Sequence, residues 1–251
     1  MTNSSDIQLL YGDCFELMHD IPDKSVDLVL TDPPYLFNRG GGTNAGTDTN
    51  AIGGKSELYK FGNKMMGEMA DFGKDRIYQL LDENSRILKI MRGYYFCNET
   101  ALQYYLSWAT EHNCKYNILV LEKQPFVMNR NKYATNCEFL VRIVAKSGAG
   151  LKILDYTNSE NSLSWLYAVQ QFLPIENKLH PAEKPQNILN GVIQLNTDEG
   201  SVVLDPFMGS GTLGVVCKQN NRKYIGMEID KKYFDIADAR IQSTVKKRRL
   251  F

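Results

Sequence analysis

Short apolar runs alternate along the chain with longer segments in which apolar side chains recur every three or four residues. The runs have the length of buried strands, and the recurrence is that of helices with one buried face. Strands are expected at 7–11, 26–30, 93–97, 117–121, 139–144, 202–204 and 224–227. Helices are expected at 74–89, 100–112, 185–195, 211–219 and 231–245. This alternation predicts an α/β fold, a mostly parallel twisted sheet with helices on both faces.

Two segments interrupt the alternation. Residues 39–64 are rich in Gly, Thr and Asn and carry little that could be buried, so a mobile Gly-rich loop is expected. Its start close after Tyr35 favours the role of a lid, and disorder without a role is the other interpretation. Residues 147–179 are polar with isolated aromatics and are interpreted as a small insertion. The chain, 1–251, is expected to form one domain.

Composition narrows the function classes only slightly. With 43% hydrophobic residues among 251, a disordered chain is excluded. Lys plus Arg and Asp plus Glu number 29 each, so a nucleic-acid partner would require a local basic patch. The five cysteines form no pair at metal-binding spacing, which predicts no metal and a reducing, cytoplasmic location. Neither an export signal nor an apolar run of membrane-spanning length is visible, so no membrane role is expected.

Two expected strands run into loops of the same kind. The strand at 26–30 leads into T-D-P-P-Y at 31–35, and the strand at 202–204 leads into D-P-F-M-G-S-G-T at 205–212. Both loops therefore place a carboxylate at the carboxyl end of a strand. In open α/β sheets this edge is where ligands bind. The sequence predicts two ligands side by side.

The second loop begins a G-x-G-x-x-G pattern at Gly209 and is followed by a strand that ends before Glu228. Alone, the pattern is typical of a dinucleotide-dependent oxidoreductase, but here four residues from Asp205 onward separate the strand from the first glycine. A carboxylate at that place suits an amine better than a phosphate. A ligand with an amine for Asp205, an apolar part for Phe207 and a ribose for Glu228 is S-adenosylmethionine. A plain glycine turn is the structural alternative.

The first loop offers two acceptors and an aromatic ring. Asp32 precedes a proline, which keeps the chain extended, and Pro33 and Pro34 leave carbonyls without competing N–H donors. A carboxylate and a carbonyl match the two hydrogens of an exocyclic amine, and Tyr35 offers a face to a planar base. Asp32 can also take up the proton released after methyl transfer. A rigid turn capped by Asp is the alternative interpretation.

Together the two loops resemble those of the amino-directed DNA methyltransferases of the β class, in which D-P-P-Y precedes D-P-F-x-G-S-G-T. The resemblance extends over nearly the whole chain, through G-D-C at 12–14, residues 129–138 and H-P-A-E-K-P at 180–185. It implies a circularly permuted, Rossmann-like methyltransferase fold with an antiparallel edge strand. It also implies methyl transfer from S-adenosylmethionine to the N6 amine of an adenine flipped out of DNA. Cytosine-directed members usually carry Ser in place of Asp32, which favours adenine.

The resemblance also implies roles for individual residues. The catalytic residues that it implies are Asp32, Pro33, Pro34 and Tyr35. The residues implied for the cofactor are Asp13, Cys14, Lys184, Pro185, Asp205, Pro206, Phe207, Gly209, Ser210, Gly211, Thr212 and Glu228. His180 is expected to be structural, and not a catalytic base. Glu183 departs from the uncharged residue often seen at its position, in a loop that is expected to be exposed.

Other functions remain open at this stage. The same loops suit a cytosine-N4 DNA methyltransferase or an RNA amino-methyltransferase, and a fold of this kind also serves non-catalytic nucleic-acid-binding relatives. Residues 147–179 occupy the place of target recognition in the family. DNA is the expected partner. Further expectations are a homodimer, a partner enzyme in a restriction-modification system, and a bacterial or phage origin.

Overall fold

The central strands of the computed structural model, such as β2 (Leu28–Thr31), are buried on both faces of one sheet. In β2, Leu28 and Leu30 pack in the core on one side of the sheet, whereas Val29 packs in the core on the other. Successive side chains of a strand point to opposite faces, so two covered faces require an unbroken apolar run. The structure describes residues 6–35, 72–129, 132–147, 169–172, 175, 179–180 and 182–245.

The strands of this described part pair in the order β1-β8-β7-β2-β3-β5-β4-β6. The remaining strands are β1 (Ile7–Tyr11), β3 (Arg92–Cys97), β4 (Cys114–Asn129), β5 (Lys132–Ala145), β6 (Val169–Phe172), β7 (Val202–Asp205) and β8 (Lys223–Glu228). Every strand that the sequence predicts is confirmed, with the predicted ends for β1 and at least one shifted end for each of the others. Pairing is parallel from β1 through β8, β7 and β2 to β3, as the alternation of elements predicts.

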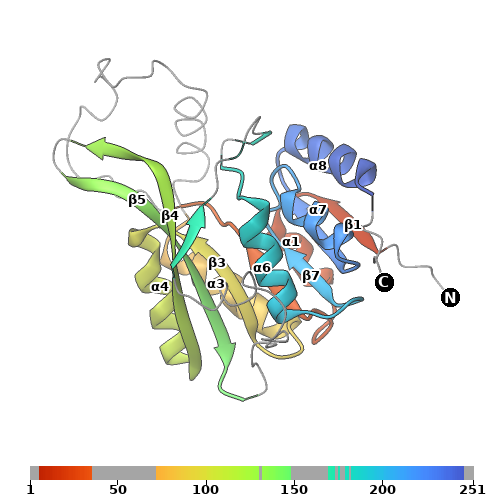
Figure 1. The fold of residues 1–251 in the computed structure, drawn as a ribbon. Helices are drawn as coiled ribbons and strands as arrows, with labels where there is room; N and C mark the ends of the chain where they lie inside the picture. Colours follow the sequence, from red (N-terminus) through yellow and green to blue (C-terminus); the bar gives the residue numbers. More distant parts are fainter. Residues whose placement is uncertain are drawn as a thin grey trace, which may run out of the picture.

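The antiparallel part of the sheet differs from the expectation. β5 pairs antiparallel with both β3 and β4, whereas β6 pairs parallel with β4 and lies at the edge. The expectation of an antiparallel edge strand is therefore wrong. The antiparallel strand is β5, which lies inside the sheet between β3 and β4. Figure 1 shows β4 and β5 as long neighbouring strands. β6, which lies inside residues 147–179, was not predicted, because V-Q-Q-F has too few apolar residues to form a recognisable run.

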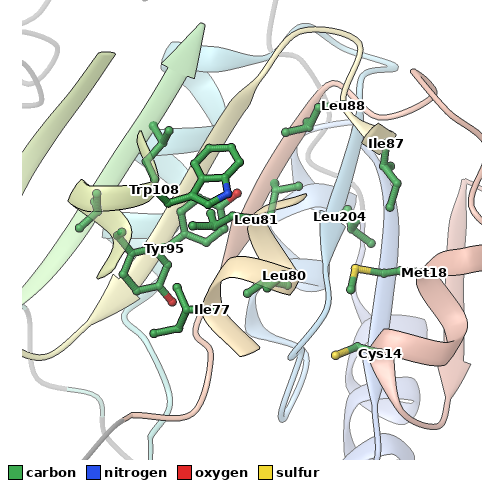
Figure 2. Packing of buried hydrophobic residues seen from close by; sticks show 14 of the residues in the cluster. Cys14, Met18, Ile77, Leu80, Leu81, Ile87, Leu88, Tyr95, Trp108 and Leu204 are labelled. Atoms are coloured by element: carbon green, nitrogen blue, oxygen red, sulfur yellow. The ribbon is translucent and has the colours of Figure 1, made fainter. Parts of the chain in front are cut away.

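Helices cover both faces of the sheet. One face carries α1 (Cys14–Leu17), the 3-10 helix η1 (Met18–Asp20), α3 (Lys74–Ile87) and α4 (Glu99–Glu111), and the other carries α6 (Gln186–Asn196), α7 (Thr212–Gln219) and α8 (Lys231–Ser243). Figure 2 shows the first core, where Cys14, Leu81 and Trp108 gather over Tyr95 and Leu204 of the sheet. The five predicted helices are confirmed to within two residues at each end.

The short helices α1 and η1 were not predicted, because one turn of helix is too short to show the recurrence of apolar residues every three or four positions. None of the helices in the described ranges is long and apolar enough to cross a membrane.

The neighbouring strands β2 and β7 are followed by helices on opposite faces of the sheet. The next described helix after β2 is α3, which packs on one face, and β7 is followed by α7 on the other. Adjacent parallel strands with diverging connections leave a crevice at their carboxyl ends. Asp32 follows β2 and Asp205 ends β7. The two Asp-Pro loops are therefore neighbours at a ligand-binding edge, although 173 positions separate these carboxylates in the sequence.

Candidate active site

The first Asp-Pro loop presents a carboxylate with one oxygen paired and one left over. Oδ2 of Asp32 lies 3.0 Å from Nζ of Lys184. The buried Oδ1 atom has no hydrogen-bond partner among the residues that the structure describes. Burial raises the pKa of Asp32, Lys184 opposes this shift, and the nearby Glu138 adds to it. A buried acceptor without a donor is costly. The loop therefore has the property of a site that receives a donor.

Lys184 lies at the centre of a buried polar cluster. Its ammonium donates to the Tyr35 hydroxyl at 2.9 Å and lies 3.2 Å from Oε1 of Glu138. The Tyr35 hydroxyl donates to the same Oε1 atom at 2.5 Å. Burial alone would lower the pKa of Lys184, but Asp32 and Glu138 raise it above its usual value. Lys184 is therefore a cation that compensates one of the two carboxylates.

Lys184 was predicted to contact the cofactor, and no role was predicted for Glu138. The structure brings both to Asp32 and Tyr35, and the cofactor contact of Lys184 stays a prediction. Glu138 reaches this edge because it lies on β5 one residue before Phe139, which pairs with Cys97 at the end of β3. A Glu inside an apolar strand was the signal that could have revealed the cluster, since a buried carboxylate needs a partner.

The second loop holds Asp205 among donors from two neighbouring strands and from the loop itself. The Thr31 hydroxyl donates to Oδ1 at 2.7 Å, the Phe207 N–H donates to the same oxygen at 3.2 Å, and the Tyr224 hydroxyl donates to Oδ2 at 3.3 Å. Burial nevertheless raises the pKa of Asp205 to about 7. Thr31 ends β2 immediately before Asp32, so its hydroxyl ties the first loop directly to the second.

The glycines of the second loop have backbone conformations that side chains disfavour. The φ angles of Gly209 and Gly211 are +52° and +78°. A Cβ atom on Gly211 would lie 2.9 Å from Cβ of Ala237, so α8 leaves room only for glycine. The Gly209 N–H donates to Oε2 of Glu228 at 2.9 Å. The loop is therefore a tight turn anchored to the end of β8, and Thr212 begins α7 directly after it.

Predicted residues at the ends of β1 and β8 lie along the same edge. The Gly12 N–H donates to the carbonyl of Glu228 at 3.0 Å, and burial raises the pKa of the Glu228 carboxyl. Asp13 caps α1 by accepting from the Phe15 N–H at 2.8 Å. Because β1, β8 and β7 are consecutive in the sheet, the structure brings Asp13, Glu228 and Asp205 to one row of strand ends.

Several predicted residues contribute packing around this row. Cys14 is buried, and burial raises the pKa of its thiol, which makes it unreactive. Pro206 is buried, and Phe207 meets Phe72 edge-on with ring centroids 5.5 Å apart. Pro185 is the N-cap residue of α6 and is buried. Their contacts are apolar, so a role toward a ligand stays a prediction.

The segment H-P-A-E-K-P is more buried than the sequence suggests. The expectation of an exposed Glu183 is wrong, since the residue is 7% exposed and its Oε1 atom lies 2.7 Å from Nη2 of Arg240. Arg240 follows 57 residues later, beyond the reach of local pattern reasoning. His180 accepts from the Ala182 N–H through Nδ1 at 3.1 Å. Burial and Lys184 lower its pKa to about 4, so the ring is neutral at neutral pH, and its structural role stays a prediction.

Comparison with known proteins identifies the family. A family model described as DNA methylase, N6_N4_Mtase, matches residues 26–239. The chain is 29% identical to the Type II methyltransferase M.HpaI of Haemophilus parainfluenzae, over 95% of this chain and 75% of that protein. It is 24% identical to the DNA adenine methyltransferase YhdJ of Escherichia coli (strain K12), over 93% of this chain and 82% of that protein.

A solved structure supports the same fold. The PvuII DNA methyltransferase, described as cytosine-N4-specific, superposes with a TM-score of 0.70 at 16% identity, over 94% of this chain and 86% of its own. This likeness confirms the Rossmann-like methyltransferase fold. Because the family model matches most of the chain, the protein belongs to the N6_N4_Mtase family of DNA methylases.

Proposed function

We propose that the protein transfers the methyl group of S-adenosylmethionine to the exocyclic N6 amine of adenine in DNA. One observation carries the proposal: the buried Oδ1 atom of Asp32 has no partner within the described residues, in a loop that also carries the Tyr35 ring. An amine that enters this loop would donate a hydrogen to that oxygen. The relative YhdJ, which is named a DNA adenine methyltransferase, supports adenine as the base.

The second loop fits S-adenosylmethionine. A carboxylate whose pKa burial raises to about 7, as in Asp205, gains strongly from a cationic partner such as the ammonium of the cofactor. Glu228 would accept from the ribose hydroxyls, and the turn at Gly209 and Gly211 permits close approach of the backbone. Asp13 and Cys14 would border the adenine ring of the cofactor. When bound, the cofactor supplies a methyl group activated by a sulfonium.

Asp32 would carry the central step. By accepting a hydrogen of the amine, it draws the nitrogen lone pair out of conjugation with the base and aims it across the crevice. Its raised pKa suits uptake of the proton that the methylated amine releases. Lys184 holds Oδ2 and so leaves Oδ1 for the amine. Because a base in a duplex cannot reach this loop, the nucleotide must flip out, and Tyr35 would replace part of its lost stacking.

Methyl transfer to unmethylated DNA tests the proposal. Purified protein incubated with labelled S-adenosylmethionine should yield N6-methyladenine on nucleoside analysis. Asp32→Ala should lower the rate by about 10²- to 10⁴-fold, the range for loss of a general base, while its affinity for S-adenosylhomocysteine stays within a factor of about three, a change below about 0.7 kcal/mol. N4-methylcytosine as the product, or a preference for RNA, would replace adenine in DNA as the substrate. A wild-type protein that transfers no methyl group contradicts the proposal.

The two unusual segments and the partners complete the proposal. Residues 39–64 lie outside the described residues, and we propose that they close over the flipped nucleotide. We propose that residues 147–179, of which β6 joins the sheet, read the target sequence. Exchange of this segment with that of a relative should change the sequence methylated in host DNA. We further propose that the protein forms a homodimer, which light scattering would test. We also propose that it is a cytoplasmic protein of bacterial or phage origin, with a restriction enzyme as its partner.

A further inference from the structure

Two adjacent residues before α6 point their charges at different loops. Glu183 and Lys184 are 7% and 8% exposed. Oε1 of Glu183 accepts from the Thr212 hydroxyl at 2.9 Å, at the end of the second Asp-Pro loop. Nζ of Lys184 lies 3.0 Å from Oδ2 of Asp32 in the first loop. One peptide unit therefore separates an anchor on the cofactor loop from an anchor on the catalytic loop.

Arg240 completes the anchor on the cofactor loop. It reaches from α8 and places Nη2 at 2.7 Å from Oε1 of Glu183. Its Nη1 atom donates to the Thr212 hydroxyl at 3.0 Å and to the carbonyl and hydroxyl oxygens of Ser210, both at 3.3 Å. Glu183 and Arg240 thus hold both ends of the turn around Gly211, where an added Cβ atom would lie 2.9 Å from Cβ of Ala237 on α8.

The Glu183 end of this ion pair is buried, both of its carboxylate oxygens are hydrogen-bonded, and the Arg240 end is partly buried. The side chains of Arg240 and Glu183 are 20% and 3% exposed, and Oε2 of Glu183 accepts from the Leu179 N–H at 3.0 Å. Burial alone would raise the pKa of Glu183, but the Leu179 N–H, Arg240 and the Thr212 hydroxyl together lower it. The carboxylate therefore stays ionised at neutral pH. A buried pair of this kind fixes geometry, because either charge left alone in the interior is strongly unfavourable.

We propose that Glu183 is a positioning residue that sets the cofactor loop relative to Asp32, through Arg240 and Thr212 on one side and Lys184 on the other. The inference rests on the proposed methyl transfer, since it concerns the alignment of methyl donor and amine. We call the Glu183–Arg240 ion pair, together with its bonds to Ser210 and Thr212, the brace. Its loss should loosen the turn from Ser210 to Thr212. It should therefore weaken cofactor binding and also lower the rate of transfer from bound cofactor, because a small misplacement of reacting groups is costly.

The variants Glu183→Gln and Arg240→Gln test the brace, with Glu83→Gln as the matched control. Glu83 also forms an ion pair with an arginine, Arg86, at 2.9 Å, and both of these side chains are partly buried. Glu83 lies on α3, outside the site. In Glu183→Gln and Arg240→Gln the Kd for S-adenosylhomocysteine and the KM for S-adenosylmethionine should each rise about tenfold or more, and kcat should fall severalfold. Glu83→Gln should move the melting temperature and none of these constants.

Two further variants distinguish loss of the brace from loss of the folded structure. Arg240→Lys keeps the buried charge but cannot bond Glu183, Ser210 and Thr212 together, so it should fold normally by circular dichroism and still weaken S-adenosylhomocysteine binding severalfold. The double variant Glu183→Gln/Arg240→Gln leaves no unpaired charge. It should lose clearly less than the product of the two single effects.

The outcomes separate the brace from the proposed function. Wild-type constants in folded Glu183→Gln or Arg240→Lys overturn the brace, as does strict additivity in the double variant. Wild-type protein that binds S-adenosylhomocysteine and yet methylates no DNA overturns the proposed function alone, because the binding measurements still report on the brace. Wild-type protein that does not bind S-adenosylhomocysteine overturns both.

Discussion

The ionised carboxylate of Asp205 is needed for the proposed ligand contact, but its burial lowers the stability of the folded protein. Its pKa of about 7, against an ordinary 3.8, means that ionisation is disfavoured in the folded protein. At about 1.4 kcal/mol per pKa unit, the effect has an upper bound of about 4 kcal/mol. Since the folded pKa is the higher one, the stabilisation is complete below the unfolded pKa and is lost as the pH rises through about 7.

Asp205→Asn should therefore raise the free energy of unfolding at pH 8 while abolishing cofactor binding. The amide oxygen still accepts from the Thr31 hydroxyl, and no charge remains to be buried. We expect a gain of about 1–3 kcal/mol at pH 8 and much less at pH 5, measured by urea unfolding of the ligand-free protein. Equal destabilisation at both pH values would show that the side chain acts through packing instead.

Lys184 should control the pH at which Asp32 works. Its ammonium opposes the rise in the pKa of Asp32 that burial and Glu138 cause. Lys184→Met removes that opposition, so the pKa of Asp32 rises and the acidic limb of the kcat/KM profile moves to higher pH. Lys184→Arg keeps the cation and should keep the limb near its wild-type position. A rate that falls equally at all pH values in Lys184→Met would contradict this electrostatic role.

At the scale of elements, the packing of α8 against the second loop depends on Gly211. Gly200 provides the matched control, because its φ is +79° but nothing lies within 4 Å of its Cβ position, whereas Gly211 at +78° has Ala237 at 2.9 Å. Gly200→Ala should cost only backbone strain, about 1 kcal/mol. Gly211→Ala should cost about 2 kcal/mol more, because α8 must shift. Urea unfolding of both variants gives the comparison, and equal losses would refute the packing argument.

The elements show what pattern reasoning can reach and where it stops. Strands such as β2 are predictable because both faces are covered, so that Leu28, Val29 and Leu30 form an unbroken apolar run. β6 and α1 are not, because one is too polar and the other too short for a period to appear. Within the site, Asp32 and Asp205 are predictable since each follows a strand. Glu138 and Arg240 are not, because their partners lie on distant segments and only the fold brings the charges together.

At the scale of the whole molecule, the sheet divides the site into two parts, which the Thr31 hydroxyl and the adjacent residues Glu183 and Lys184 connect. Asp13, Glu228 and Asp205 lie at the ends of β1, β8 and β7, whereas Asp32 follows β2. The hydroxyl of Thr31 crosses between the two parts at 2.7 Å. Cofactor binding should therefore stabilise the whole fold and not depend on the catalytic carboxylate. By mass action, ligand at about 100 times its Kd adds about 2.7 kcal/mol.

This linkage should depend on pH through Asp205. Pairing with an ammonium requires the carboxylate, so binding below pH 7 must release a proton, and the affinity for S-adenosylhomocysteine should be about tenfold weaker at pH 6 than at pH 8. His180, with a pKa of about 4, stays neutral throughout this range, and Lys184 stays charged. Burial also raises the pKa of Glu228, which acts in the same direction.

Calorimetry in buffers of different ionisation enthalpy measures the proton directly. Wild-type protein and Asp32→Ala should both release close to one proton on binding at pH 6 and almost none at pH 8, and ligand should raise the melting temperature more at pH 8. Proton uptake on binding, or an affinity that does not change between the two pH values, would mean that Asp205 does not meet the cofactor amine. The cationic end of the ligand would then have to lie elsewhere along the row of strand ends.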